Sequence, residues 1–240
     1  MRLLFAKVGA FVSLLLLFVA IAPWVLVWPT MAWRNRLSLL AGRLWARVVL
    51  ALAGVRVEYR GVGHLRHPAI LTFNHTSYLD FFFNAPLAGS RCMVFGKREL
   101  AKLPFLGWAW LLGGHPLIKR EDPSHWKREM ERTARVLREE GYSSMIAPEG
   151  RRSRDGVLLP FKKGAFHLAL DSGLPLQPVV IHGAAERMKT GFPTPGRVVV
   201  EVLPPIETSG WSEDELDLRA TELRERYAAR LEAAAATPAG

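Results

Sequence analysis

Residues 69–80 read AILTFNHTSYLD, and the fold of the chain can be inferred outward from this stretch. Residues 69–73 form a short apolar run, which is typical of a buried β-strand. Ser77 and Asp80 follow it as an S-x-x-D pattern, which indicates the start of a helix. A strand that leads through a polar turn into a helix is the basic unit of an α/β fold.

The same alternation of strand-like and helix-like segments continues to the C-terminus. The segments expected to be strands are 55–59, 92–95, 144–147, 177–181 and 197–202. The segments expected to be helices are 126–140, 164–172 and 212–236. Strands joined through helices pair in parallel, because the crossover returns the chain to the same edge of the sheet. The sequence therefore predicts one α/β domain over residues 55–240, with a mostly parallel sheet flanked by helices.

The first 57 residues differ from the rest because they contain no Asp or Glu. Their charges are all basic, at Arg2, Lys7, Arg34, Arg36, Arg43, Arg47 and Arg56. Residues 8–33 are an uncharged run of 26, longer than the ~20 apolar residues that span a bilayer. In the next apolar run, 37–55, Arg43 and Arg47 share one helical face. We expect residues 1–54 to form a membrane-embedded or re-entrant helix followed by an amphipathic interfacial helix.

Two other interpretations of this segment stay open. A cleaved secretory signal would use the early basic residues, the apolar run and the small residues Ala20 and Ala22. A soluble core helix would also be apolar, although 26 residues without charge is long for one. The whole chain has 32 Lys and Arg against 22 Asp and Glu, and its mean hydropathy is +0.10. This composition favours an anionic lipid surface as the partner.

The clearest candidates for catalysis lie in the turn at 74–80. His75 follows a strand, where α/β folds display reactive groups, and a neutral imidazole can accept a hydroxyl proton. Asp80 can hold the other ring nitrogen and fix its tautomer. No Ser or Cys with a nucleophile-elbow motif accompanies the pair, so it suits activation of a substrate hydroxyl against an activated acyl donor. The alternative is that His75 is a turn residue and Asp80 only a helix cap.

A second segment, APEGRRSR at 147–154, places Arg151, Arg152 and Arg154 beside Gly150. Guanidinium groups bind phosphate through paired, charge-assisted hydrogen bonds, so this loop is a candidate phosphate site. The FKKG sequence at 161–164 adds positive charge shortly afterwards. The alternative is a solvated basic loop, which is the commoner outcome for an isolated charge run.

A third segment joins cations to apolar residues, with GKREL at 96–100 followed by LPFLGW at 103–108. Such a segment can line the path of an acyl chain whose polar end meets Lys97 or Arg98. A core helix with a charged first turn is the simpler interpretation, and the pattern alone favours it.

Four blocks of sequence, taken in order, resemble the glycerolipid acyltransferase family. Residues 75–80 match its HxxxxD pattern, and residues 96–107 its GKxxL and PFxG block. Residues 149–153 are similar to its EGTRS block, and LQPVVI at 176–181 to its closing block. The likeness spans about residues 55–205. Within the family it is greatest to the 1-acyl-sn-glycerol-3-phosphate acyltransferases.

This resemblance implies a membrane-bound enzyme that takes an acyl group from acyl-CoA or acyl-carrier protein. The implied acceptor is the sn-2 hydroxyl of 1-acylglycerol-3-phosphate, the product is phosphatidate, and no acyl-enzyme forms. His75 is implied as the general base and Asp80 as the residue that orients it. The implied phosphate ligands are Lys97, Arg98, Arg151 and Arg152, and the implied acceptor loop contains Glu149, Gly150 and Ser153.

Arg151 departs from the family pattern, which usually has Thr at this position. Its charge can strengthen the grip on a phosphate or accommodate a different anionic headgroup. Acceptors such as a lyso-ornithine lipid or lysophosphatidylglycerol therefore stay open. A non-catalytic protein that binds anionic lipid is a further alternative.

The expected partners are a lysophospholipid, an acyl thioester and a membrane surface. We expect no nucleic acid, because no nucleic-acid motif accompanies the charge. We also expect no metal, since the His residues lack ligand spacing, and no cofactor beyond the thioester co-substrate. Thioester donors are cytosolic, and the basic residues around the apolar runs favour the same side. The expected location is the inner (cell) membrane, with the active site facing the cytoplasm.

Overall fold

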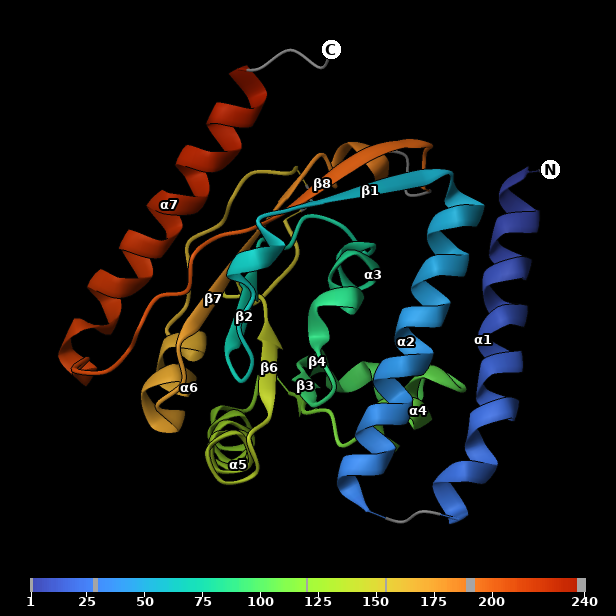
Figure 1. The fold of residues 1–240 in the computed structure, drawn as a ribbon, viewed down its shortest axis with the longest axis horizontal. Coiled ribbons are helices and arrows are strands. Elements are labelled where there is room, and N and C mark those ends of the chain that lie inside the picture. The colour runs from blue at the N-terminus through green and yellow to red at the C-terminus, as the bar shows by residue number, and fades with distance from the viewer. Residues whose placement is uncertain (1, 28–29, 120, 154, 189–192, 237–240) are drawn as a thin grey trace.

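The structure, a computed structural model, describes residues 2–27, 30–119, 121–153, 155–188 and 193–236. Helices cover both faces of a six-stranded sheet (Figure 1). The strands in spatial order are β1 (Val55–Arg60), β8 (Gly196–Val202), β7 (Leu176–His182), β2 (Ile70–Phe73), β6 (Ser143–Ile146) and β3 (Cys92–Val94). β7 and β8 pair antiparallel, and the other neighbours pair parallel. The predicted α/β fold with a mostly parallel sheet is confirmed.

The helices that surround the sheet are α1 (Arg2–Val27), α2 (Met31–Ala53), α3 (Asp80–Asn84), α4 (Leu106–Leu112), α5 (Pro123–Glu140), α6 (Gly164–Ser172) and α7 (Leu216–Ala236). A separate short ladder pairs β4 (Gly96–Lys97) with β5 (Leu117–Ile118). α5 begins earlier than the sequence predicts, because Asp122 accepts a hydrogen bond from His125 N and Pro123 suits a first helical turn.

Side chains of the sheet alternate between two hydrophobic cores, one on each face. In β7, Val179 and Ile181 pack in the core that includes α2 and α3, whereas Val180 packs in the core that includes α5, α6 and α7. Tyr227 ties α7 to the middle of the sheet, because its hydroxyl donates to Thr72 O at 2.7 Å and accepts from Val179 N at 3.1 Å. Burial on both faces is the usual state of a parallel sheet.

One buried polar side chain anchors α2 to the edge of the sheet. Asn35 Nδ2 donates to the carbonyl oxygens of Cys92 and Gly113 at 3.0 and 2.9 Å, and Asn35 Oδ1 accepts from Cys92 N at 3.1 Å. β3 is an edge strand, so the backbone N–H and C=O of Cys92 have no further strand to pair with on that side. The side-chain amide of Asn35 binds both groups instead. α2 thus shares a core with the domain that follows it. The predicted division at residue 54 stays a prediction.

α1 lies beside α2 at one side of the molecule (Figure 1). The ring of Phe18 contacts the rings of Phe105 and Trp108, with centroids 5.3 and 5.5 Å apart, so α1 also packs on the segment around α4. These helices and the turn before α4 expose large apolar side chains, namely Val8, Phe11, Val12, Leu16, Val19, Leu40, Leu44, Val48, Leu52, Leu103, Trp108 and Leu111. In the part of the chain that the structure describes, no helix is both long and apolar enough to cross a bilayer. Membrane attachment of residues 1–54 stays a prediction.

Candidate active site

Three neighbouring parallel strands end at the same edge of the sheet. β2 leads into residues 74–80, β6 into 147–153 and β3 into 95–98. These segments carry the residues that the sequence predicts for catalysis and phosphate binding. Loops at the carboxyl ends of strands are the usual place for a site in an α/β sheet.

His75 and Asp80 form a hydrogen-bonded pair at this edge. His75 Nδ1 lies 2.8 Å from Asp80 Oδ2, and the same oxygen accepts from Thr76 N and Ser77 N at 2.9 Å each. The Asp80 side chain is fully buried, whereas the imidazole is 26% exposed. The carboxylate therefore holds both the ring and the turn between the two residues.

The turn delays the helix that the S-x-x-D pattern predicts. α3 starts only at Asp80, because Ser77 Oγ accepts from Leu79 N at 3.1 Å instead of capping a helix at residue 77. The carboxylate of Asp80 folds back onto the backbone of Thr76 and Ser77. Asp80 also holds the imidazole of His75, and this second role explains why the turn differs from a simple capping box.

The contacts of Asp80 decide which nitrogen of His75 is free. Asp80 Oδ2 already accepts from two backbone N–H groups, so it is also the acceptor toward His75, and Nδ1 carries the proton of the neutral ring. His75 Nε2 makes no hydrogen bond to any residue that the structure describes. Burial raises the pKa of the Asp80 carboxyl, and the hydrogen bonds from His75 and the backbone oppose that rise. The free Nε2 is the atom that can accept a proton from a bound hydroxyl.

Glu149 braces the backbone of His75 from the end of the neighbouring strand. Glu149 Oε1 accepts from His75 N at 2.6 Å, and Oε2 accepts from Leu159 N at 2.9 Å. The side chain is buried, and burial raises the pKa of its carboxyl while these two hydrogen bonds lower it in part. Because each oxygen already holds a backbone N–H, Glu149 fixes the relative position of the two loops.

A direct backbone hydrogen bond also joins the loops, because Ser153 N donates to His75 O at 2.8 Å. Ser153 Oγ donates to Asp155 at 2.7 Å. Gly150 has φ +69°, a conformation that favours glycine, and a Cβ there would lie 3.0 Å from Cδ of Lys162. The loop at 147–153 is thereby held against the turn that carries the imidazole.

The cations of this loop differ in their surroundings. Arg152 lies over the ring of Tyr78, with its guanidinium carbon 4.2 Å from the ring centroid. Arg151 is exposed, and Arg154 lies outside the residues that the structure describes. Among the described residues, no carboxylate lies within ion-pair distance of Arg151 or Arg152. Both guanidinium groups therefore remain available to an anionic ligand.

Lys97 and Arg98 follow β3 at the same edge of the sheet and are exposed. Within the described ranges, no hydrogen bond, ion pair or ring contact links either side chain to His75 or to the loop at 147–153. The structure joins that loop to His75 directly but leaves Lys97 and Arg98 without such a link. Their role as phosphate ligands stays a prediction.

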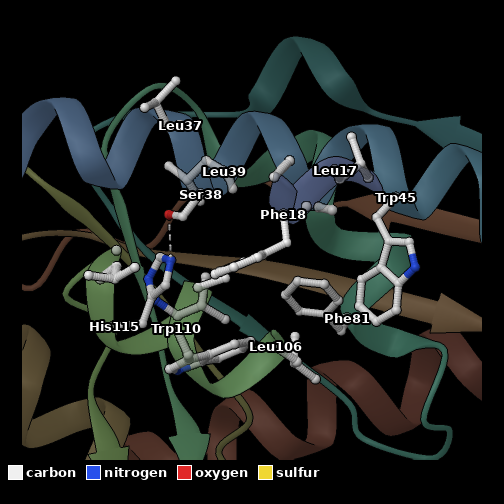
Figure 2. Close-up of a pocket in the computed structure, with 18 of the residues that line it drawn as sticks. Leu17, Phe18, Leu37, Ser38, Leu39, Trp45, Phe81, Leu106, Trp110 and His115 are labelled. Atoms are coloured by element: carbon white, nitrogen blue, oxygen red, sulfur yellow. Dashed lines mark hydrogen bonds between the residues drawn. The ribbon is translucent and has the colours of Figure 1, made fainter. Parts of the chain in front are cut away.

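An apolar pocket of about 80 Å³ is lined in part by α3, the helix that begins at Asp80. Phe81, which directly follows Asp80, is part of its wall, as is Ala85. Figure 2 shows Phe18 from α1 and Trp110 from α4 pointing into the same space as Phe81. The other large apolar side chains of the wall are Leu14, Leu17, Leu37, Leu39, Trp45, Phe105, Leu106, Leu112 and Met145. The segment at 103–108, for which the sequence offers an acyl path as the alternative to a core helix, contributes Phe105 and Leu106 to this pocket.

Phe105 enters the pocket from a strained backbone. Its φ of +64° and ψ of −52°, with Leu106 N donating to Pro104 O at 2.7 Å, correspond to a rare γ-turn. The chain then passes so close to the preceding turn that a Cβ on Gly107 would lie 2.5 Å from Ala101 O. The γ-turn at Phe105 and the close backbone contact at Gly107 are the structural basis of the PFxG pattern.

His115 is a polar member of the pocket wall. Its Nδ1 accepts from Val94 N at 3.2 Å, so Nε2 carries the proton and donates to Ser38 Oγ at 3.0 Å (Figure 2). Burial lowers the pKa of His115 to about 4. The ring is therefore neutral at pH 7 and belongs to the pocket as an uncharged group.

Because the imidazole of His115 is buried and neutral, we predict that the protein loses stability in acid. An unfolded histidine titrates near 6.5, so between that pH and about 4 the unfolded state binds one more proton at His115 than the folded state. Stability therefore falls as the pH drops through this window, by about 3 kcal/mol in total. His115→Asn keeps an acceptor for Val94 N but cannot titrate. Urea unfolding at pH 7 and pH 4 is expected to show a smaller decrease in the free energy of unfolding for this variant than for the parent protein. Equal decreases would contradict the assignment of this pKa to His115.

Three features of the site lie beyond the sequence patterns. The hydrogen bond from His75 N to Glu149 and the contact of Arg152 with Tyr78 both join segments that are far apart in sequence. For the contact between Arg152 and Tyr78, the only local signal is that an aromatic residue lies inside the S-x-x-D pattern. Ser38 and His115 meet in the pocket from two different elements, and nothing near either residue indicates the contact.

Comparison with known proteins gives consistent matches. The family described as Acyltransferase matches residues 56–182. A 1-acyl-sn-glycerol-3-phosphate acyltransferase of Limnanthes douglasii is 38% identical over 195 residues, which cover 80% of this chain and 69% of that protein. The protein of the same name in Haemophilus influenzae is 32% identical over 193 residues, covering 78% of this chain and 80% of that protein.

One solved structure is similar over nearly the whole chain. The crystal structure of the 1-acyl-sn-glycerophosphate acyltransferase of Thermotoga maritima superposes with a TM-score of 0.70. The match covers 97% of this chain and all of the other, at 22% sequence identity. At that identity the likeness supports the fold alone.

Proposed function

The chain belongs to the acyltransferase family, and from that premise we propose that it transfers an acyl group from a thioester to the sn-2 hydroxyl of 1-acyl-sn-glycerol-3-phosphate. The products are phosphatidate and a free thiol. The observation that carries this proposal is the His75–Asp80 pair, because the backbone of His75 is hydrogen-bonded to the loop that carries Arg151 and Arg152.

In the proposed reaction His75 acts as a general base. Its Nε2 takes the proton of the acceptor hydroxyl as the hydroxyl oxygen attacks the thioester carbonyl. The tetrahedral intermediate collapses with cleavage of the carbon–sulfur bond, and the thiolate takes the proton back from the imidazolium. Asp80 holds the ring through Nδ1 and stabilises the imidazolium while it exists.

The acyl group is proposed to pass directly between substrates. Among the described residues, neither Ser77 Oγ nor Ser153 Oγ is hydrogen-bonded to the imidazole, because Ser77 Oγ accepts from Leu79 N and Ser153 Oγ donates to Asp155. The thiol of Cys92 is fully buried, and burial raises its pKa to about 12. These side chains therefore form neither the histidine-activated serine nor the low-pKa thiol that commonly carries an acyl-enzyme.

The acceptor phosphate is proposed to bind the guanidinium of Arg152, with Arg151 beside it. Arg152→Ala is expected to raise the apparent KM for the lysophospholipid by about ten-fold or more, because a charge-assisted hydrogen bond contributes ~1.5–3 kcal/mol. The kcat at saturating acceptor is expected to change much less. Arg132→Ala, which removes a guanidinium already paired with Glu129 on α5, is the control. An unaltered KM in the Arg152 variant would count against phosphate binding there.

The apolar pocket is proposed to hold part of the acyl chain. It is smaller than the ~150 Å³ cavity that accepts benzene, so it encloses a segment of a long chain at most. Gly42 lines it, and a Cβ there would make an ordinary 3.5 Å contact with Phe81. Gly42→Ala therefore fits, whereas a Leu side chain would fill the space.

We expect Gly42→Leu to lower kcat/KM for palmitoyl donors at least about ten-fold more than for octanoyl donors, because small volume changes in an apolar site discriminate on this scale. Gly42→Ala is the matched control and is expected to keep the preference of the parent enzyme. A Leu variant that slows both donors equally would place the acyl chain elsewhere.

The membrane is proposed to contact the exposed apolar side chains of α1, α2 and α4, without a spanning helix being required. The absence of acidic residues before Glu58 fits an anionic lipid surface. The proposed location is the cytoplasmic face of the cell membrane, where thioester donors are available. The donor is proposed to be acyl-CoA or acyl-carrier protein, with no further cofactor.

A panel of acceptors and donors tests the proposed function. Purified enzyme is given lysophosphatidate, lysophosphatidylglycerol or a lyso-ornithine lipid, each with acyl-CoA and with acyl-carrier protein, and diacylated product is measured. We expect the highest kcat/KM with lysophosphatidate. A preference for another lysolipid would move the assignment to that acceptor, and no product with any pair would favour a non-catalytic lipid-binding protein.

A further inference from the structure

Tyr78 is an aromatic residue of the catalytic turn that points away from the protein core. It lies between His75 and Asp80 in sequence, and it is 68% exposed. The guanidinium of Arg152 is 4.2 Å from the centroid of its ring, closer than the 5.5 and 5.7 Å of the other guanidinium–ring contacts in the described residues. The site that holds the imidazole thus also supplies a platform for a cation of the neighbouring loop.

The geometry of this contact leaves the cation free to bind a ligand. A guanidinium that stacks on a ring uses its flat face, whereas its five N–H donors lie in the plane of the group and point outward. Arg152 has no carboxylate partner among the described residues, so those donors are not consumed by an ion pair. The contact with the ring therefore restricts where the side chain lies, and it leaves the N–H donors that recognise phosphate without an anionic partner among the described residues.

We propose that Tyr78 is a positioning residue that sets the guanidinium of Arg152 for the acceptor phosphate. The inference rests on the proposed function, since it names the residue that places the phosphate ligand of that same site. Tyr78 belongs to the turn fixed by Asp80, and Arg152 precedes Ser153, whose N–H donates to His75 O. The contact thereby relates the phosphate-binding group to the imidazole through one short, hydrogen-bonded turn.

The test compares three variants that separate the ring from the hydroxyl. Tyr78→Leu removes the aromatic face and is expected to raise the KM for lysophosphatidate about two- to five-fold, with kcat at saturating acceptor retained. Tyr78→Phe keeps the face and is expected to retain the parent KM. Val157→Ala removes a similarly exposed side chain from the segment that follows Arg152 and is expected to change neither parameter.

Coupling to Arg152 distinguishes positioning from a general structural effect. In an Arg152→Ala background, Tyr78→Leu is expected to raise KM no further, because the group that it positions is absent. An equal rise in both backgrounds, or a Phe variant as impaired as the Leu variant, would overturn the inference. The unfolding temperature of each variant is measured beside the kinetics, and a fall in Tyr78→Leu alone with KM unchanged would also overturn it.

A binding measurement separates this inference from the proposed function. Glycerol 3-phosphate is titrated into the parent enzyme and into the Leu and Phe variants of Tyr78 by calorimetry. Weaker binding in Tyr78→Leu only would support the positioning role even if the enzyme used a different phosphorylated acceptor. An enzyme that acylates lysophosphatidate but binds glycerol 3-phosphate equally in all three forms would retain the function and refute the role of Tyr78.

Discussion

Replacement of His75 by alanine is expected to lower kcat by ~10²–10⁴-fold, the usual contribution of a positioned general base. The structure gives the reason, because His75 Nε2 is free to accept a proton while Nδ1 is held by Asp80 at 2.8 Å. The imidazole is 26% exposed, so its removal leaves no large cavity in either hydrophobic core. Turnover with saturating lysophosphatidate and acyl-CoA measures the effect.

The same variant should retain its fold and its acceptor binding. Its unfolding temperature and its affinity for glycerol 3-phosphate are expected to match those of the parent enzyme, because Glu149 and Ser153 contact the backbone of residue 75 and not its ring. Turnover within a few-fold of the parent would rule out His75 as the base. A loss of folding would be visible in the same measurements and would be separated from a loss of catalysis.

The second large effect is expected for Asp80→Asn, with kcat lower by at least ~10²-fold. An amide oxygen can still accept from the ring and from the backbone of Thr76 and Ser77, so the turn is retained. The negative charge is lost, however, and with it the stabilisation of the imidazolium that forms at His75 in the proposed reaction. Asparagine is preferred to alanine because the side chain is buried and holds two backbone N–H groups.

The two residues are expected to act as one unit. The double variant His75→Ala/Asp80→Asn should be no slower than His75→Ala alone, because the carboxylate is proposed to act through the imidazole. Losses that multiply would show that Asp80 has a separate role in the reaction. Kinetics of the two single variants and the double variant, on the same preparation of substrate, provide this comparison.

The parts of the fold that follow from local pattern could be predicted. The strand at 70–73 and the helix Gly164–Ser172 are marked by apolar runs, turn residues and a glycine stop, and each lies within a residue or so of its expected place. The pairing of His75 with Asp80 is also local, since five positions separate them. Hydrophobic period and short-range hydrogen bonds carry this information along the chain itself.

Contacts between distant segments could not be predicted from such patterns. Asn35 reads as an ordinary polar residue of an apolar helix, yet its amide pairs with Cys92 at the edge of the sheet. Glu149 reads as part of a basic loop, yet it braces the backbone of His75. In each case the partner is chosen by the strand order, which brings together segments that no local signal connects.

The segment before residue 55 shows a further limit of composition. Its lack of acidic residues indicates an anionic or lipid partner, but it does not reveal that α2 shares a core with the domain through Leu39, Val49 and Leu50. The same helix exposes Leu40, Leu44 and Leu52 on its other side. A helix that packs on the protein core with one side and exposes apolar residues on the other is apolar all round. The sequence alone therefore does not tell which of its apolar residues face the core and which face outward.

Direct transfer between two bound substrates is the central claim, and one measurement tests it most directly. The enzyme is mixed with acyl-CoA alone, its intact mass is recorded and thiol release is followed, and lysophosphatidate is then added. We expect no mass increase and no thiol before the acceptor, and then equal amounts of thiol and phosphatidate after it. An acyl adduct on the protein, or thiol released without matching phosphatidate, would contradict the account.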